Sequence, residues 1–534
     1  MARLLRKSKL IFLLILLISR ITDAQSNAPL DNTIRKSIER ATRYFDENLS
    51  VDGGYVWTYS QDLTRRWGEL EARPNIIWVQ GPGTVRMGHT FLDIYEKLND
   101  PYYLNLALKA GLALAKGQME CGGWNYFINF DDEASTKEWY NTIGKNAWRF
   151  EEFHHYYGNA TFDDNTTTGA ADFLLRLTFF TDNEVIKSSL EKAIRFIVDS
   201  QYEIGGWPQR FPIKDKFEKE GNPDYTSFLT FNDGVNLDNT IFLIKLYFVL
   251  DDSSFIEPIK RAIEFIKISQ QPNPQAGWAM QYNLELQPEG ARTYEPKALC
   301  PGYTLQNVNA LINFFELTGD SSLIKRIPDA FIWLKSVRVS SEDNYFLVPT
   351  FVELETNKTL YLHRIGSNVK YGKYYYDYDN EKLIKHYNSL RIIGFDHVFQ
   401  KYQKLSEMHF SDNRGYLFLE SLNDLTAPQK YQHINSFFSF DYYTTDWKMP
   451  EDFIKKIVTE QDEKGRWLTR NAFISYPYTG EPESGDDSTN DITTTMVGDK
   501  YDTSTFENTA DEKFISTALF IRNIKLLLQF LSQN

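Results

Sequence analysis

The chain has 534 residues, of which 42% are hydrophobic and 15% aromatic, and its formal net charge at pH 7 is −14. This length and hydrophobic content are sufficient for a large core, whereas the acidic balance argues against nucleic-acid binding and against a general attraction to polyanions. A polyanionic ligand would therefore need a local groove lined by basic residues or by a metal ion.

The first 24 residues have the pattern of a secretory signal peptide. Basic residues precede the apolar run LIFLLILLI, and small residues end the segment at Ala24. The run is too short to span a bilayer, and no comparable run follows it. We therefore expect a secreted protein, extracellular or periplasmic, that does not insert into a membrane.

A loop containing tryptophan recurs along the chain. Gln stands six residues before Trp in QMECGGW, QYEIGGW and QDEKGRW, which end at Trp124, Trp207 and Trp467; a looser copy runs from Gln271 to Trp278, and DGGYVW is a degenerate first member. Amphipathic, helix-period runs precede and follow each loop. Repeated helical hairpins of this kind predict an all-α fold, an α/α toroid or incomplete barrel with the Trp loops on one face.

The chain after the signal peptide divides into three parts. The first and last parts carry helical hairpins that complete the toroid. The middle part also has a β-branched and aromatic stretch, Tyr345 to Asp379, which predicts a small β insertion within residues 340–380. Residues 480–511 are polar and acidic and predict a flexible loop. The expected parts are residues 25–160, residues 161–390 and residues 391–534.

Two cysteines, Cys121 and Cys300, occur in the chain, which excludes a framework of several disulfides. An exported protein could pair them. The favoured interpretation is that they are two isolated, small hydrophobic residues.

Two polar loops precede predicted helices in successive repeats. TFDDNTTTGA contains Asp164, and TFNDGVNLDN contains Asp233. Either aspartate alone would be explained as a helix N-cap. Loops of successive repeats would lie side by side, however, and carboxylate oxygens brought together suit Ca²⁺.

Two further loops carry candidate residues. LQPEGARTYEP contains Arg292 and Tyr294, although a loop arginine is most often a solvated surface residue. GGWPQRFP lies between the Asp164 and Asp233 loops. We therefore expect its Gln209 and Arg210 to face substrate, and its Trp to be mainly a structural feature of the repeat.

The chain lacks the sequence motifs of several enzyme classes. The chain has no GxSxG elbow, phosphate loop, HExxH or dinucleotide fingerprint. Hydrolysis of glycosides by paired carboxylates remains open, because acidic residues are plentiful. A glycan-binding protein without catalytic activity, which stacks sugars on its Trp loops, is a second alternative.

Over residues 160–390 these motifs resemble the pectate lyases of polysaccharide lyase family ten, whose core is helical. The corresponding segments follow one another in the same order as in that family. They are Asp164–Asn165, Gly205–Gln209, Thr230–Asp233, Trp278–Gln281, Ala291–Glu295, and Thr356–Asn357 followed by Arg364.

The resemblance implies β-elimination on a uronic-acid polymer. This chemistry requires that the C6 carboxylate be neutralised, that a base remove the C5 proton, and that the C4 oxygen leave. By the resemblance, Asp164 and Asp233 would help to hold a Ca²⁺ ion that binds the uronate. Arg292 would be the base, and Arg364 would bind a substrate carboxylate. Tyr294 is the rival base, because a phenol can act as an acid or a base.

The substrate prediction depends on departures from the family pattern. PKALCPGYT replaces a Ser-rich stretch after the Arg292 motif, and YYYDYDN replaces a basic pair beyond Arg364. Fewer arginines and more tyrosines suggest spaced uronates, and the build is similar to secreted ulvan lyases of marine bacteria. We expect an endo-acting, monomeric enzyme on an anionic polysaccharide, ulvan before pectate, with Trp278 among the residues that bind substrate.

Overall fold

The computed structural model describes most of the chain. The described residues are 29–148, 150–214, 224–342, 345–365, 373–381, 383, 389–408, 416–417, 419, 422, 424–439, 449–480, 502–507 and 511–533. The predicted signal peptide lies outside them, as does most of the predicted loop 480–511. Within these ranges, no helix is both long enough and apolar enough to cross a membrane.

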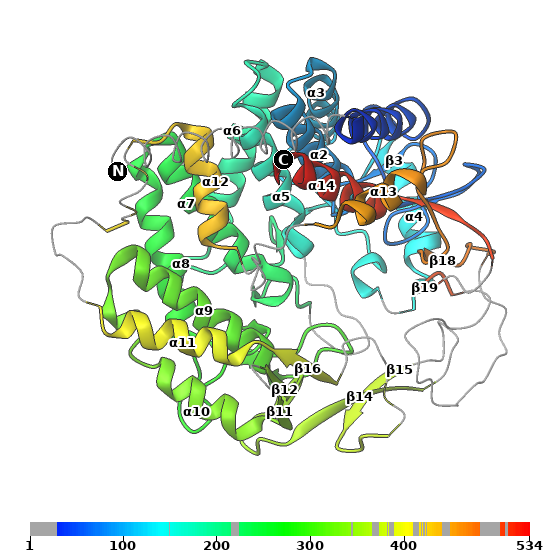
Figure 1. Ribbon diagram of the computed structural model, residues 1–534. Helices are drawn as coiled ribbons and strands as arrows, with labels where there is room; N and C mark the ends of the chain where they lie inside the picture. The colour runs from blue at the N-terminus through cyan, green and yellow to red at the C-terminus, as the bar shows by residue number, and fades with distance from the viewer. Residues whose placement is uncertain are drawn as a thin grey trace, which may run out of the picture.

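Helical hairpins form the body of the protein (Figure 1). In each hairpin a Trp loop joins a first helix to a second helix. The first helices are residues 29–48, α3 (Pro101–Lys116), α6 (Glu184–Asp199), α8 (Ile256–Ile268) and α13 (Glu451–Thr459). The second helices are α2 (Thr84–Leu98), α5 (Thr166–Leu177), α7 (Val235–Leu250), α9 (Pro301–Thr318) and α14 (Thr517–Gln533). The other helices are α4 (Glu133–Trp139), α10 (Ile327–Val337), α11 (Phe395–Ser406) and α12 (Ala427–Phe437).

The second helices form an inner layer. α2 contacts both α14 and α5, and α5 contacts α7. α5 is buried over nearly its whole length, whereas α6 buries one face that includes Ile186, Leu190, Ala193 and Ile197. This spacing of three and four residues is that of an amphipathic helix with a solvated side. The sequence periodicity therefore places the first helices on the outside.

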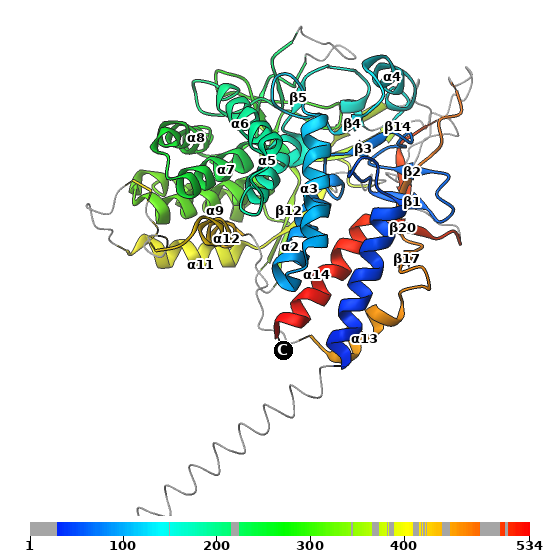
Figure 2. The same ribbon diagram turned by 90° about the horizontal axis from the view of Figure 1, so that it is seen from above.

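The last hairpin lies next to the first (Figure 2). The rings of Phe45, in helix 29–48, and Phe520, in α14, have centroids 4.3 Å apart. The Thr517 amide donates to the Trp57 carbonyl at 2.9 Å, and β1 (Thr58–Ser60) pairs with β20 (Phe514–Ser516). The chain therefore forms an incomplete α/α toroid, as predicted, in which the hairpins from the two ends of the chain are neighbours.

Short strands occupy the loop face and the predicted insertion. The insertion forms two small antiparallel sheets, as expected from its residues. Its strands are β11 (Ser340–Glu342), β12 (Tyr345–Pro349), β13 (Phe351–Glu353), β14 (Thr359–Ile365) and β15 (Lys373–Asp377). The two sheets also include β10 (Ala298–Leu299) and β16 (Leu390–Ile393), which lie outside the predicted range. The other strands are β2 (Arg66–Trp67), β3 (Ile76–Trp78), β4 (Phe127–Asn129), β5 (Ala160–Thr161), β6 (Arg210–Phe211), β7 (Leu229–Thr230), β8 (Gln281–Tyr282), β9 (Pro288–Glu289), β17 (Leu468–Thr469), β18 (Phe473–Ser475) and β19 (Thr505–Glu507). Cys121 and Cys300 are both free, which confirms the favoured interpretation.

The Trp loops have a common hydrogen-bonding pattern. Trp207 is fully buried and its indole N–H donates to the carbonyl of Ile197, ten residues earlier, at 2.8 Å. The Gln201 amide donates to Gly205 in its own loop at 2.8 Å and to Pro258, in the next hairpin, at 3.0 Å. The glutamine therefore fastens one repeat to the following one.

The same glutamine contact recurs in three of the other four loops; the first loop, which ends at Trp57, has no such glutamine. Gln118 donates to Ser189 at 2.9 Å, and Gln461 donates to Ser37 at 2.9 Å. The second bond joins the last hairpin to the first. In the looser copy the bond from the loop to the next unit comes from Gln270, which reaches Arg326 at 3.1 Å. The assignment of this position to Gln271 from the sequence is therefore wrong by one residue, because this loop has two extra residues: Gln270 stands eight residues before Trp278, compared with six in the other copies.

Gly205 is required where two hairpins meet. Its φ of +106° is in the left-handed region, and a Cβ added there would lie 2.0 Å from the Arg261 carbonyl oxygen of α8. Gly122 and Gly465 have the same close approach to the next outer helix. A side chain at these positions would push neighbouring repeats apart.

We expect Gly205→Ala to lower the free energy of unfolding by about 2–4 kcal/mol, because it adds both backbone strain and a clash with backbone atoms. Gly302→Ala in α9 is the matched control, since its added Cβ would meet nothing within 4 Å. The control should leave stability unchanged or raise it by up to about 1 kcal/mol. Denaturant titration measures both changes, and an equal loss in the two variants would contradict the packing argument.

Candidate functional site

Two equivalent turns place aspartates at the start of neighbouring inner helices. The turns are η3 (Asp163–Asn165) before α5 and η4 (Asn232–Gly234) before α7, and they contact each other. Asp164 and Asp233 occupy the same position, with φ of 49° and 50°. Neither turn nor the helix that follows it has a side-chain cap. The N-cap explanation is therefore wrong, and the expectation that the two loops lie side by side is confirmed.

Arg292 enters this pair of turns from the loop that precedes α9. Its guanidinium donates to Glu152 at 3.2 Å, to Glu295 at 3.0 Å and to Asp163 at 2.8 Å, and Nη1 lies 3.8 Å from the Asp233 carboxylate. Each guanidinium nitrogen thus faces a carboxylate, and only 4% of the side chain is exposed. Burial alone would lower the pKa of Arg292, but the surrounding carboxylates, Asp163 first, raise it well above its usual value.

Asp163 is the best-connected carboxylate of the cluster. Besides Arg292, it accepts hydrogen bonds from the Tyr126 hydroxyl at 2.7 Å and from the Gln209 amide at 2.8 Å. Burial opposes ionisation of Asp163. The positive charge of Arg292 and, to a smaller extent, the hydrogen bonds from Gln209 and Tyr126 outweigh burial and hold the pKa of Asp163 below its usual value. Gln209 is 2% exposed and is turned toward Asp163. That it faces substrate stays a prediction, whereas its contact with Asp163 gives it a positioning role.

The cluster has more negative than positive charge. Asp164 and Asp233 stand beside the three carboxylates that hold Arg292, so five carboxyl groups surround one guanidinium. Enclosure by the protein and repulsion from Asp163 raise the pKa of Asp164 to about 7, although part of its side chain remains exposed and Gln80 donates a hydrogen bond to it. Burial and repulsion from Asp164 raise the pKa of Asp233 well above its usual value.

Asn232 links the second turn to the arginine. Its amide donates to Asp233 at 2.7 Å and to Glu295 at 3.2 Å, and its carbonyl accepts from the Tyr303 hydroxyl at 2.7 Å. These bonds fix the carboxylates on either side of Arg292.

Among the described residues, no three His, Cys, Asp or Glu side chains form a group that could hold a metal ion.

Two cavities meet the cluster. Arg292 and Glu295 line a cavity of about 410 Å³, together with Lys297, Lys373, Tyr374 and Tyr376. Asp164 lines another of about 640 Å³ between α2, α5 and α14. The cluster is therefore accessible from both, and basic residues line each of them.

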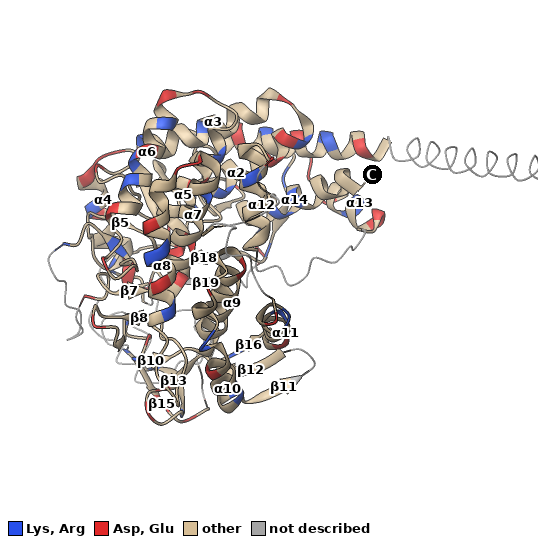
Figure 3. Cartoon of the chain, turned by 90° about the vertical axis from the view of Figure 1, so that its left-hand side faces the viewer, with Lys and Arg blue, Asp and Glu red and all other residues tan. Residues whose placement is uncertain are grey.

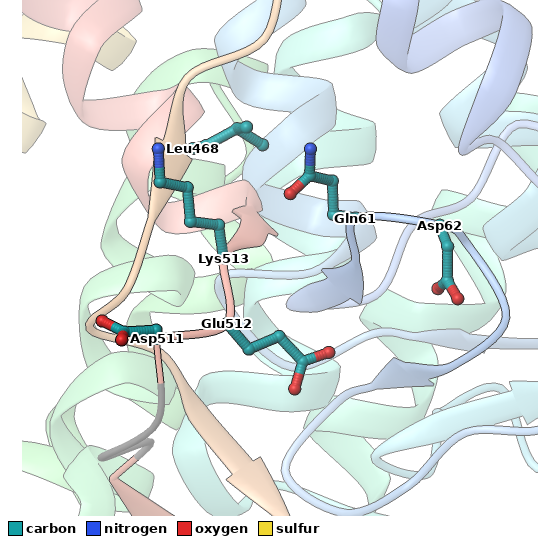
Figure 4. Close-up of a pocket in the computed structure, with 6 residues that line it drawn as sticks. All are labelled: Gln61, Asp62, Leu468, Asp511, Glu512 and Lys513. Atoms are coloured by element: carbon teal, nitrogen blue, oxygen red, sulfur yellow. The ribbon is translucent and has the colours of Figure 1, made fainter.

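A larger cavity, of about 700 Å³, lies elsewhere (Figure 4). Its lining residues are Gln61, Asp62, Leu468, Asp511, Glu512 and Lys513. None of the candidate site residues lines it, and its three carboxylates against one lysine suit a polyanion poorly. Chemistry rather than volume therefore favours the Arg292 cluster as the site.

The other predicted site residues are buried. Trp278 is fully enclosed and donates to the Ile266 carbonyl at 2.9 Å, so its prediction as a substrate contact is wrong: it is the tryptophan of its repeat. Arg210 and Arg364 are each 1% exposed, and both lie against aromatic rings, Arg364 against Trp148. Their contact with a polymer stays a prediction, and the contacts that the structure shows for them include these rings.

Tyr294 does not line the 410 Å³ cavity. It is 2% exposed and packs against Leu362 of β14 and Tyr374 of β15, with the tyrosine ring centroids 5.1 Å apart. Arg292, not Tyr294, lines the 410 Å³ cavity. Of the two rival bases, the arginine is therefore the one at the cavity surface.

No motif or periodicity in the sequence marks Glu152, Gln80 or Tyr126 as a site residue. Glu152 belongs to a short turn, η2 (Glu151–Phe153), without helix periodicity or a repeat motif. Only the folded chain brings it to Arg292, 140 residues away. Lys, Arg, Asp and Glu are otherwise interspersed over the helices (Figure 3).

The pectic acid lyase family model matches residues 118–384, which is 267 of the 534 residues. The chain belongs to the pectic acid lyase family. It is therefore a polysaccharide lyase, and the matched segment includes Asp164, Asp233 and Arg292. Helices α2 and α14 lie outside the matched segment. No curated protein matches the chain.

Solved structures with some similarity include lyases and other carbohydrate enzymes. A mutant family 10 polysaccharide lyase from Cellvibrio cellulosa, in complex with trigalacturonic acid, is 13% identical over 66% of this chain and 98% of its own, with a TM-score of 0.36. A sugar epimerase from a ruminal bacterium is 10% identical over 95% and 99%, with a TM-score of 0.43. An α-mannanase of glycoside hydrolase family 76 from Bacteroides thetaiotaomicron is 8% identical over 94% and 96%, with a TM-score of 0.40.

The raised pKa of Asp164 predicts a pH-dependent stability. Its pKa is about 7 in the folded protein and about 3.9 when unfolded. Between these values the folded state binds more protons, so stability should fall as pH rises from about 4 to about 7. With a chelator present, Asp164→Asn should reduce this fall and raise the melting temperature above pH 7.

The control for this experiment is Asp182→Asn. Asp182 is fully exposed and makes only a surface pair with Lys187. Melting curves across the pH range should be unchanged by this substitution. If Asp164→Asn lowers the melting temperature above pH 7, its carboxylate is stabilising and the charge argument fails.

Proposed function

We propose that the protein cleaves a uronate-containing polysaccharide by β-elimination, leaving a 4,5-unsaturated uronate at the new end. The observation that carries this proposal is the Arg292 guanidinium, held by Glu152, Asp163 and Glu295 at the surface of a cavity lined by lysines. A fixed cationic group suits a substrate whose reactive carbon lies beside a carboxylate. Membership of the pectic acid lyase family supports the same reaction class.

The lysines supply charge for substrate carboxylates. Lys297 and Lys373 line the same cavity as Arg292. The ion pair between Lys297 and Glu289 is long, with 3.4 Å between the ammonium nitrogen and the carboxylate oxygen. The ring of Tyr376, which is 47% exposed, offers an apolar face in the same lining. Sugar rings pack on such faces, so this cavity suits the residue whose C5–H bond is broken.

Asp164 and Asp233 are the residues we propose to hold Ca²⁺. Both are hard oxygen donors, and their pKa values are raised because each is crowded by other carboxylates. A divalent cation would relieve this repulsion, but the described residues offer it no group of three such ligands, so water and substrate oxygens would have to complete its coordination. When bound, the ion would neutralise the uronate carboxylate and make the C5 proton more acidic.

Arg292 is the proposed base and Tyr294 the alternative. Arg292 has the better access to the cavity, but its carboxylate neighbours hold it protonated, because they raise its pKa. Proton abstraction by Arg292 therefore requires that this negative charge be offset when substrate is bound. Asp163, fixed by Tyr126 and Gln209, orients the guanidinium for that step.

The proposals for the substrate and for the location of the protein rest on different observations. The family model favours a galacturonate polymer. The proposal of ulvan rests on the tyrosine-rich replacement of a basic pair, part of which is β15. Secretion rests on the pattern of residues 1–24.

The reaction is tested by incubating the protein with polygalacturonate and with ulvan while following the ultraviolet absorbance of the unsaturated uronate. We expect absorbance to rise on at least one polymer and to be lost in a chelator. Calcium should also raise the melting temperature of the wild type but not that of Asp164→Asn. Cleavage without absorbance would indicate a hydrolase, and binding without cleavage a glycan-binding protein.

The base is tested by comparing Arg292→Ala with Tyr294→Phe. We expect the arginine change to lower kcat by about 10²–10⁴-fold, as for loss of a general base. Tyr294→Phe keeps the packing against Leu362 and Tyr374 and should retain most activity. If only the tyrosine change abolishes turnover while substrate binding persists, Tyr294 is the base.

A further inference from the structure

A second groove leads away from the cluster. The 640 Å³ cavity that Asp164 lines shares Trp57, Glu69, Pro82 and Ala518 with a neighbouring cavity of about 400 Å³. The two therefore form one continuous groove along α2 and α14, the inner helices of the first and last hairpins. Cavities of this size are typical of sites for ligands of a few sugar units.

Three basic side chains form one wall of this groove. Arg86 on α2 and Arg522 and Lys525 on α14 all line it, and all three are exposed. In the described part of the chain, no carboxylate lies within ion-pair distance of any of them, although Arg86 acts electrostatically on Asp238. Arg522 donates only to the Asn523 side chain, at 3.2 Å for the shorter of two bonds. In a chain with a net charge of −14, three unpaired cations side by side in a groove call for a ligand.

The acidic groups of the groove do not cancel this wall. Asp172 receives the Lys245 ammonium at 2.7 Å and the Tyr431 hydroxyl at 2.7 Å, so its charge is already offset. Gln80 donates to Asp164. The remaining carboxylate in the lining is Glu69, which also lines the neighbouring cavity.

His89 adds no charge to the groove. It lies 3.9 Å from Asp172, but burial lowers its pKa to about 3, more than Asp172 raises it. The attraction of the groove for anions therefore comes from the three basic residues of α2 and α14.

Trp57 provides an apolar surface between the two cavities. Its indole N–H donates to the Gln80 carbonyl at 3.0 Å, which fixes the ring, and the side chain is only partly buried. The ring lines both cavities. An aromatic face beside cationic groups matches a sugar ring that carries an acid group.

We propose that Arg86, Arg522 and Lys525 form a subsite for an anionic sugar residue of the polysaccharide, beyond the residue that reacts near Arg292. This inference rests on the proposed function. The ligand chemistry is a carboxylate or a sulfate ester on a pyranose ring. Because α2 and α14 lie outside residues 118–384, the hairpins from the two ends of the chain would extend the substrate site of the family segment.

The subsite is tested with the triple variant Arg86→Ala, Arg522→Ala, Lys525→Ala. The matched control is Arg35→Ala, Lys192→Ala, Arg195→Ala, which removes two exposed arginines and one exposed lysine from outer helices. All six side chains are solvated, so both variants should fold, as melting curves would verify. Binding to polygalacturonate, to ulvan and to a neutral galactan is measured in a chelator.

We expect the triple variant to weaken binding of at least one anionic polymer by at least about fivefold at low salt, with little difference at high salt. The control variant and the neutral polymer should show no such change. An effect on polygalacturonate indicates a carboxylate ligand, and an effect confined to ulvan indicates a sulfate ester. In turnover assays KM should rise by a similar factor while kcat stays nearly constant.

Equal behaviour of the triple variant and its control would overturn the subsite. That outcome leaves the proposed reaction intact if the wild type still forms unsaturated uronate. Conversely, salt-sensitive binding that depends on the three residues, without any unsaturated product, would support the subsite and contradict the lyase reaction.

Discussion

The arrangement of the repeats depends on the side-chain amide of one glutamine in four of the five Trp loops, the exception being the first loop, which ends at Trp57. Gln201 bonds its own loop and the Pro258 carbonyl of the next hairpin, and Gln461 bonds Ser37, which joins the last hairpin to the first. A buried carbonyl left without a donor costs about 1–3 kcal/mol, so each amide satisfies two costly groups at once. Because the acceptors are backbone atoms, the other loop residues are free to differ between repeats.

The geometry of the candidate site depends on these contacts between neighbouring hairpins. Asp164 and Asp233 are the same position of two neighbouring repeats, and the fixed contact between hairpins brings their turns together. A third repeat then supplies Arg292, whose three nitrogens each reach a carboxylate. A site made from equivalent turns is necessarily rich in one charge, because each repeat contributes the same residue type.

The repeat, the toroid and the pairing of the aspartate turns could be predicted from the sequence, because helix periodicity and the recurring Gln and Trp are local signals. The carboxylate of Glu152 could not, since its contact with Arg292 spans 140 residues and no motif marks it. Which of the candidate side chains are buried could not be predicted from the sequence either. Trp278 has the same residue type whether it stacks on a sugar or fills a core, and only its fully enclosed indole distinguishes the two.

The charges of the Arg292 cluster and of the two cavities that meet it are distributed in a way that suits a polyanion. The acidic cluster around Arg292 would repel such a polymer if it acted alone, and its raised pKa values show that it is already crowded. Positive charge lies on either side of it, from Lys297 and Lys373 in one cavity and from the α2 and α14 side chains in the other. On the proposed function, attraction at the flanks would hold the polymer across the cluster, where the proposed cation would lie between substrate and protein carboxylates. An acidic protein can thus bind an acidic substrate, because the sign of the local field, and not the net charge, decides where the polymer binds.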